Sequence, residues 1–261
     1  MTHLTSLIIA RFVALLPAGL RIAGVVFFAP GLGAERAPPR FRIALALGLA
    51  AVVVPVCVRE VPPITAPAAY ILTCLGELAF GIALGFALRV LLEATRFGGE
   101  ILDLQIGLRA GQLFDPATGA QSGILSTGYY LIALVIFIQI DGHHWLLRGM
   151  AASFAIAPVG GLSYHPGLYE VVADLGESVF ALGLRLAGPV IAALVLADLA
   201  FGLVARAVPQ INVFIVGIPA KIALGFIVAA LGMPLVCRNL GSIVELMSKY
   251  LDSIVRAFAG Q

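Results

Sequence analysis

Residues Ala66–Leu92 read APAAYILTCLGELAFGIALGFALRVLL, an apolar run in which Glu77 and Arg89 are the only charged side chains. A helix that crosses a bilayer needs about 20 mostly apolar residues, so this run is long enough. Within it, Gly81 and Gly85 form a G-x-x-x-G spacing that lets two helix backbones approach closely. We expect a long helix here, packed tightly either within this chain or against a second copy.

Five further apolar segments follow the same pattern along the chain. They are Leu4–Phe28, Ile43–Val58, Ile124–Ile140, Ser178–Ala205 and Ile211–Cys237. The sequence is 61% hydrophobic and 11% charged, whereas soluble domains carry about 25% charged residues. Because too few polar side chains are present to cover a globule of this size in water, the sequence predicts an all-α protein of the membrane.

Seven charged side chains interrupt the longer apolar segments. They are Arg11, Arg21, Glu77, Arg89, Arg185, Asp198 and Lys221. A charge at the centre of a bilayer costs at least about 2.5–3.5 kcal/mol, so such helices are poorly suited to face lipid on all sides. Two interpretations stay open. The charges face other helices or a water-filled path, or the helices do not lie wholly in lipid.

Charge and cysteine content narrow the class of protein further. The net charge of +2 is too balanced for nucleic-acid binding, which needs clustered basic side chains. Arg11 interrupts the first apolar stretch and no basic run precedes it, so we expect an uncleaved first helix. Loop arginines favour an N-terminus outside the cytoplasm. Cys57, Cys74 and Cys237 lack metal-ligand spacing, and we expect three small buried side chains.

The sequence contains no motif typical of catalysis or of a metal site. Asp141-Gly142-His143-His144-Trp145 holds adjacent histidines, but neighbouring helical residues point about 100° apart and rarely bind one ion together. We expect a turn at the level of the lipid headgroups there, with Trp145 as an anchor, and then a polar loop over Arg148–Glu177. The chain is therefore expected to be no enzyme and to need no metal or cofactor.

The most unusual stretch is Glu93–Gly123, EATRFGGEILDLQIGLRAGQLFDPATGAQSG. Its first half is amphipathic and is expected to be helical. A Gly-rich run, Gly107–Gly111, comes next and is followed by Phe114-Asp115-Pro116, where Pro116 disfavours helix at Asp115. The pattern fits an ordinary connecting loop, and it also fits a loop that lines or closes an opening.

The last two apolar segments form a predicted helical hairpin. Its turn, Arg206–Phe214, reads RAVPQINVF, and Pro209 breaks the helix there. Gln210 and Asn212 place amide groups, which need hydrogen-bond partners, in an apolar region. Lys221 can extend its side chain toward this polar corner. A simple re-entrant turn and a surface for a partner protein are both compatible with these residues.

Five motifs stand in order along the chain. They are RIAGVVFFAPGLGAERAPPRFRIALALGLA (Arg21–Ala50), GELAFGIALGFALR (Gly76–Arg89), GGEILDLQIGL with FDPATG (within Gly98–Gly119), DGHHWLL (Asp141–Leu147) and PQINVFIVGIPAKI (Pro209–Ile222). Together they resemble the FliR family of flagellar export-gate proteins, called SctT in the related injectisomes. The segment Leu186–Ile222 also resembles FliQ, a small hairpin protein of the same machine.

The resemblance implies an architecture and a set of partners. Residues 1–177 would form a FliP-like helical part with a plug loop at about 107–123, and residues 178–261 a FliQ-like hairpin with a C-terminal helix. Such chains assemble with several FliP and FliQ homologues into a cone of helical hairpins, only partly surrounded by lipid. FlhB-like and FlhA-like export components belong to the same machine. It lies in the bacterial inner membrane, within the flagellar basal body, and passes unfolded export substrates.

Two groups of site residues follow from the resemblance. The plug would comprise Gly107, Leu108, Arg109, Gly111, Phe114, Asp115 and Pro116. Packing against FliQ-like hairpins would involve Pro209, Gln210, Asn212, Gly217, Pro219 and Lys221.

Two alternatives accompany this interpretation. One is an injectisome protein of the SctT type. The other is a secondary transporter with Glu77, Arg185, Asp198 and Lys221 lining a path. A transporter predicts inverted repeats, and the two halves of the sequence show no such symmetry.

Overall fold

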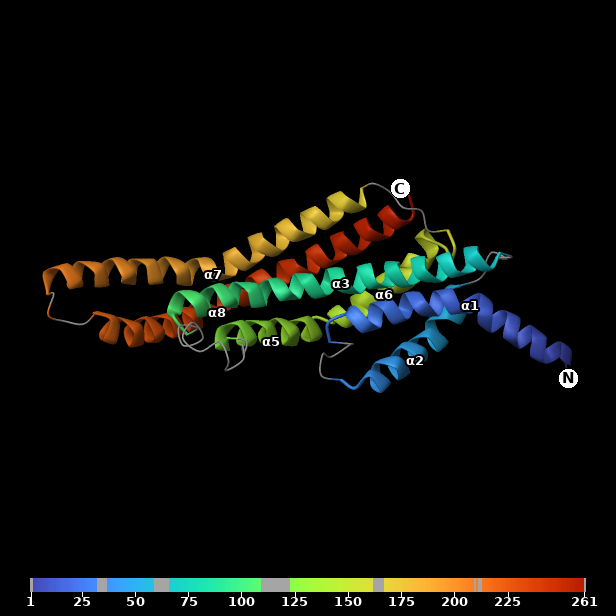
Figure 1. Cartoon of the computed structure of the whole chain (residues 1–261), viewed down its shortest axis with the longest axis horizontal. Coiled ribbons are helices and arrows are strands. Elements are labelled where there is room, and N and C mark those ends of the chain that lie inside the picture. Colours follow the sequence, from blue (N-terminus) through green and yellow to red (C-terminus); the bar gives the residue numbers. More distant parts are fainter. Residues whose placement is uncertain are drawn as a thin grey trace. The chain divides into compact units, whose positions relative to one another are not determined.

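The computed structural model describes residues 2–31, 37–58, 66–108, 123–161, 167–208, 210 and 213–260. Within these ranges the elements are all helices (Figure 1), so the predicted all-α fold is confirmed. The helices are α1 (Thr2–Phe28), α2 (Pro39–Cys57), α3 (Pro67–Ile106), α5 (Ile124–Gln139), α6 (Gly142–Ile156), α7 (Leu168–Ala207) and α8 (Val213–Phe258).

The chain divides into two compact units. Unit 1 comprises Met1–Val90, Phe137–Leu175 and Val244–Gln261, and unit 2 comprises Leu91–Ile136 and Gly176–Ile243. Helices α1, α2 and α6 therefore belong to unit 1. Helices α3, α5, α7 and α8 contribute residues to both units.

Several helices are long and apolar enough to cross a membrane. Among the described residues these are Pro39–Cys57, Pro67–Ile106, Leu168–Ala207 and Val216–Pro234, with α5 and α6 as a further, broken span. Helices α3 and α7 have 40 residues each. At about 1.5 Å per residue each is roughly 60 Å long, about twice the hydrocarbon thickness of a bilayer. A helix of this length that crosses a bilayer extends beyond the hydrocarbon layer.

In unit 1, α1 and α3 pack backbone against backbone. A Cβ atom added at Gly81 would collide with the carbonyl oxygen of Arg21, and one at Gly85 would lie 2.8 Å from the carbonyl oxygen of Val25. On the facing helix, a Cβ at Gly24 would lie 2.7 Å from the Leu78 carbonyl oxygen. The G-x-x-x-G spacing thus serves packing within this chain, which was the first of the two expected uses.

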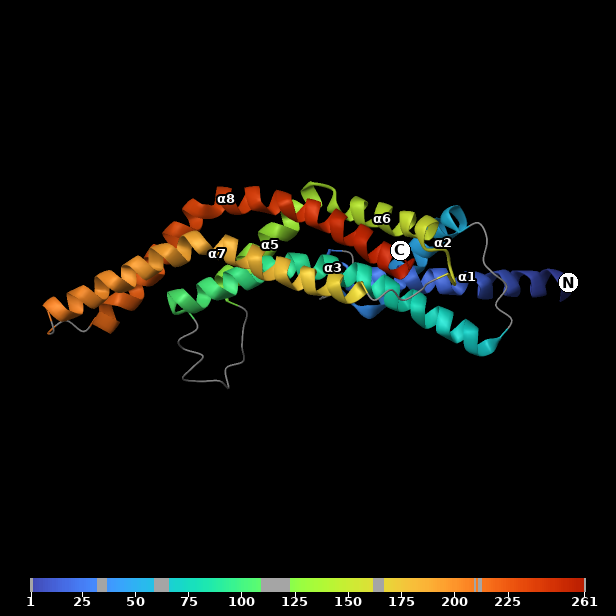
Figure 2. The ribbon, with the colours of Figure 1, turned by 90° about the horizontal axis from the view of Figure 1, so that it is seen from above.

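In unit 2, α7 and α8 lie side by side (Figures 1 and 2). Helix α7 buries an apolar stripe at Leu182, Leu186, Val190 and Leu194, a spacing of one residue per helical turn. The predicted hairpin is therefore present.

Helix α6 occupies part of the stretch that the sequence predicted to be a loop. The prediction of a loop over Arg148–Glu177 is wrong at both ends, because α6 continues to Ile156 and α7 begins at Leu168. The polar residues misled the prediction, since 142–156 also carries an apolar stripe that is buried in unit 1. The stripe consists of Leu146, Met150 and Phe154.

The turn predicted at Gly142–Trp145 lies just before these residues. The chain breaks at Asp141, which has a left-handed backbone with φ 58°, and His143, His144 and Trp145 form the start of α6. Trp145 is exposed, as expected of an anchor in the headgroup region.

Helix α8 is longer than the apolar pattern predicted. It continues past Cys237 to Phe258 because its last turns are amphipathic, with Met247, Tyr250 and Ile254 buried in unit 1. Cys237 itself is exposed and Cys57 and Cys74 are only half-buried, so the expectation of three buried cysteines is wrong.

Candidate functional site

The predicted plug residues lie at the end of α3 and just beyond it. Gly107 and Leu108 belong to the described part of the chain and are half-buried. The other predicted plug residues, Arg109, Gly111, Phe114, Asp115 and Pro116, lie outside the described residues.

The end of α3 has a well-defined backbone geometry. Gly107 has φ 90°, which a residue with a side chain adopts only with strain. The Gly107 N–H donates to the Leu104 carbonyl at 3.1 Å, and the Leu108 N–H donates to the Asp103 carbonyl at 3.0 Å. This pair of bonds is the Schellman motif that closes a helix C-terminus. Helix α3 therefore ends where the Gly-rich run begins, as the sequence predicted.

Asp103 joins the two ends of segment 107–123. Its carboxylate is fully buried and accepts hydrogen bonds from the N–H groups of Leu125, at 3.1 Å, and Ser126, at 3.0 Å. These are N–H groups of the first turn of α5, which have no partner inside their own helix. Asp103 thus caps α5 from α3 and fixes the distance between the end of one helix and the start of the next.

The sequence did not reveal this role for Asp103. A signal existed, because the residue before α5 is Gly123, which has no side chain to cap the helix itself. Gly123 also has to be small, since a Cβ there would collide with the Asp103 carboxylate.

Two adjacent glycines hold α3 against its neighbours in unit 2. A Cβ at Gly98 would lie 2.8 Å from the Gly183 carbonyl oxygen on α7. A Cβ at Gly99 would lie 2.7 Å from the Ser126 nitrogen on α5. Helices α3, α5 and α7 therefore meet at backbone distance close to Asp103, at the base of segment 107–123.

The residues expected to pack against FliQ-like hairpins lie around the tip of the α7–α8 hairpin. Gln210 and Pro219 are exposed and Gly217 is buried. Pro209 and Asn212 lie outside the described residues.

Lys221 has a partner within this chain. Its Nζ atom lies 2.8 Å from Oδ1 of Asp198 on α7, and the two side chains are 19% and 45% exposed, respectively. Gln105 on α3 approaches the same carboxylate at 3.5 Å. The sequence singled out Asp198 and Lys221 separately, and the structure brings them together across the hairpin. The pair neutralises both charges in an otherwise apolar region.

A fully buried polar cluster lies in unit 1 and joins two charges that the sequence analysis had named only separately. Arg21 on α1 and Glu77 on α3 form an ion pair between Nε and Oε2, and both side chains are inaccessible to solvent. The other carboxylate oxygen of Glu77 accepts the Gly160 N–H at 3.1 Å. Both charges are therefore paired and hydrogen-bonded, the condition under which charges persist in an apolar interior.

The guanidinium of Arg21 reaches a third helix. It donates to Oγ of Ser153 at 3.1 Å and to the Ala157 carbonyl at 2.9 Å, both at the end of α6. Its carbon Cζ lies 4.6 Å from the ring centroid of Phe80 and 4.3 Å from that of Phe154. One arginine thus ties α1, α3 and α6 together.

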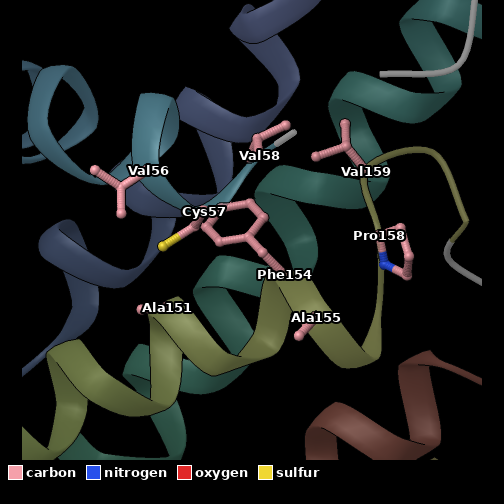
Figure 3. A pocket seen from close by; sticks show the side chains of 8 residues that line it. All are labelled: Val56, Cys57, Val58, Ala151, Phe154, Ala155, Pro158 and Val159. Atoms are coloured by element: carbon pink, nitrogen blue, oxygen red, sulfur yellow. The ribbon is translucent and has the colours of Figure 1, made fainter. Parts of the chain in front are cut away.

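Phe154 also lines an apolar pocket of about 470 Å³ (Figure 3). The ring of Phe154 points from α6 toward Cys57 at the end of α2. The remaining lining residues are Val56, Val58, Ala151, Ala155, Pro158 and Val159. Cys57 is the one lining residue among these with a reactive side chain, and the others are apolar.

Asp141, His143 and His144 cluster at the break before α6, with one ligand atom of each within 4.8 Å of the others. His144 Nδ1 lies 3.0 Å from Asp141 Oδ1, a contact between groups that are 57% and 68% exposed. A contact three residues apart at the start of a helix does not by itself define a metal site. The absence of a metal stays a prediction.

Comparison with known proteins identifies the family. Residues 12–247 match the family model described as "Bacterial export proteins, family 1". The chain is 33% identical over 251 residues to the flagellar biosynthetic protein FliR of Bacillus subtilis, covering 94% of this chain and 96% of that protein. It is 31% identical over 227 residues to FliR of Escherichia coli, covering 85% and 86%. To FliR of Aquifex aeolicus it is 28% identical over 246 residues, covering 94% and 95%. The resemblance to the FliR family is thereby confirmed, and the chain belongs to family 1 of the bacterial export proteins.

Proposed function

We propose that this chain is a non-catalytic subunit of the flagellar type III export gate, a pore through which unfolded export substrates pass. The observation that carries the proposal is the similarity to flagellar FliR proteins over 94% of the chain. The relatives compared above are flagellar, which favours a flagellar gate over an injectisome.

The pairing of charges supports a structural role over that of a carrier. Glu77 is paired with Arg21 and Asp198 with Lys221, each pair within its own unit. A proton- or ion-coupled carrier needs charged groups that are free to bind and release their cargo. Fixed ion pairs suit a subunit whose work is to hold a shape.

The same proposal extends to domains, partners and location. Residues 1–177 would form the FliP-like part and residues 178–261 the FliQ-like hairpin with its C-terminal helix. The partners would be FliP and FliQ homologues within a cone-shaped gate, with FlhB-like and FlhA-like components nearby, in the bacterial inner membrane. Exposed apolar side chains on the hairpin, such as Leu203 and Leu231, are consistent with a surface that neighbouring subunits cover.

Within this gate, segment 107–123 would act as the plug. Its two ends support that role, because the Gly107 helix end and the Asp103 cap anchor them to α3 and α5. Pro209, Gln210, Asn212, Gly217, Pro219 and Lys221 would lie at the contact with FliQ-like hairpins.

Purification from native membranes tests the proposal. An affinity tag on this chain is expected to recover FliP and FliQ homologues in fixed ratios after mild detergent extraction. The control is an equally tagged, unrelated membrane protein from the same cells. A chain that is recovered as a stable monomer or homo-oligomer, without either homologue, would contradict the proposal and favour the transporter.

A further inference from the structure

Most of the charged side chains inside the apolar segments have an interaction partner in the structure. Arg21 pairs with Glu77 and Asp198 with Lys221, and Arg89 also takes part in an interaction. The side chain of Arg11 lies outside the description. Arg185 differs from all of these, because its side chain forms no hydrogen bond, ion pair or ring contact with any described residue.

Arg185 lies on the face of α7 that the chain leaves uncovered. Helix α7 turns its buried stripe, which includes Leu182 and Leu186, toward the rest of unit 2. On the uncovered face Arg185 is exposed, together with Leu184 (53%).

The apolar surface continues beyond the next helical turn. Leu196 is 67% exposed, and a Cβ added at Gly188 would meet nothing within 4 Å. The uncovered face of α7, defined here by Leu184, Arg185 and Leu196, is therefore an apolar surface on which the guanidinium of Arg185 has no partner among the described residues.

Lipid does not suit this face, because a charge on an apolar helix surface is costly in a bilayer. Helix α2 provides the contrast. Its exposed residues Phe41, Leu47, Val52 and Val56 form an apolar surface, and no charged side chain follows Arg42 in that helix. A surface like that of α2 is satisfied by lipid, whereas the uncovered face of α7 needs apolar contact and a negative charge together.

We infer that the uncovered face of α7 docks against a helix of a neighbouring gate subunit that presents an Asp or Glu carboxylate to Arg185. The argument is charge complementarity. An arginine that becomes buried among apolar side chains requires a carboxylate, and its planar guanidinium can bind one through two parallel hydrogen bonds. The inference rests on the proposed function, since it assigns one contact within the proposed assembly.

Substitution of Arg185 tests this contact in the tagged, co-expressed complex. Arg185→Glu is expected to lower the amount of co-purified partner by roughly tenfold or more, because two carboxylates then face each other. Arg185→Lys, which keeps the charge, is expected to lose much less. The matched control is Arg148→Glu on α6, since Arg148 is also exposed and makes no side-chain contact among the described residues. This control is expected to leave recovery unchanged.

Charge reversal on the partner completes the test. One Asp→Lys or Glu→Lys substitution in a partner helix is expected to restore recovery of the Arg185→Glu chain. If assembly is lost and no such reversal restores it, the carboxylate contact is wrong. Unchanged recovery of Arg185→Glu would also overturn the inference, and would indicate that Arg185 faces lipid headgroups or water.

Two further measurements distinguish a failure of this inference from a failure of the proposed function and from loss of the variant protein. If the wild-type chain recovers no FliP or FliQ homologue, the proposed function has failed before Arg185 is examined. If Arg185→Glu does not accumulate in membranes, a photo-crosslinking residue at Leu184, beside an unaltered Arg185, replaces it. Cross-linking to a partner subunit supports the inference, and cross-linking to lipid alone contradicts it.

Discussion

Replacing Glu77 with alanine is expected to lower the apparent Tm of the purified complex by about 10 °C. The substitution leaves the guanidinium of Arg21 buried without its counter-charge, since both side chains are inaccessible to solvent. Removing one partner of a buried ion pair costs about 3–5 kcal/mol. For a protein of this size about 1 kcal/mol corresponds to a shift of roughly 2–4 °C.

Two control variants distinguish the effect of the lost counter-charge from the effect of an alanine substitution as such. Glu245→Ala, at an exposed glutamate on α8, is expected to change the Tm by no more than about 1–2 °C. The double variant Arg21→Met with Glu77→Leu removes both charges at similar volume and is expected to be more stable than Glu77→Ala alone. A Glu77→Ala protein that melts like the wild type would show that the ion pair does not hold α1, α3 and α6 together.

Replacing Asp103 with leucine is expected to destabilise the start of α5 by about 3 kcal/mol. Two buried N–H groups, those of Leu125 and Ser126, lose their acceptor, and each orphaned donor costs about 1–3 kcal/mol. Hydrogen–deuterium exchange of these two amides in the assembled complex measures the effect directly. Their exchange is expected to accelerate by roughly a hundredfold, because 1.4 kcal/mol corresponds to a factor of about ten.

Asp141 provides the matched control for Asp103. It also precedes a helix, but it is exposed and its side chain makes no capping hydrogen bond to the backbone of α6. Asp103→Asn, which keeps one carbonyl oxygen, is expected to show a smaller effect than Asp103→Leu. Asp141→Asn is expected to leave amide exchange at the start of α6 unchanged. Equal effects of the two asparagine substitutions would contradict the assigned role of Asp103.

Local features of the structure could be predicted from the sequence. Neighbouring residues determine the apolar segments and the end of α3 before the Gly-rich run. Hydrophobic periodicity and the effect of glycine on the backbone both act over a few positions. Helix α6 was missed since its polar residues obscure a stripe of only a few apolar side chains. The hairpin turn was recognisable from Pro209 and the amides beside it.

The polar contacts that shape the two units could not be predicted in the same way. Arg21 and Glu77 are 56 residues apart, and Ser153 is 132 residues from Arg21. The register in which the helices pack decides which charged side chains form a pair, and that register cannot be predicted from a single sequence. Asp198 and Lys221 attracted attention as charges in apolar segments, but only the packing of α7 on α8 shows that they neutralise each other.

We propose that the chain closes a protein-conducting pore with segment 107–123. The most direct measurement is small-ion conductance across membranes that contain the assembled gate, with residues 107–115 replaced by a shorter linker. The control is the wild-type gate at the same abundance, confirmed by recovery of the same partner subunits. We expect a tight wild-type gate and a clear ion leak in the shortened variant. An assembled, shortened gate that is as tight as the wild type would contradict it.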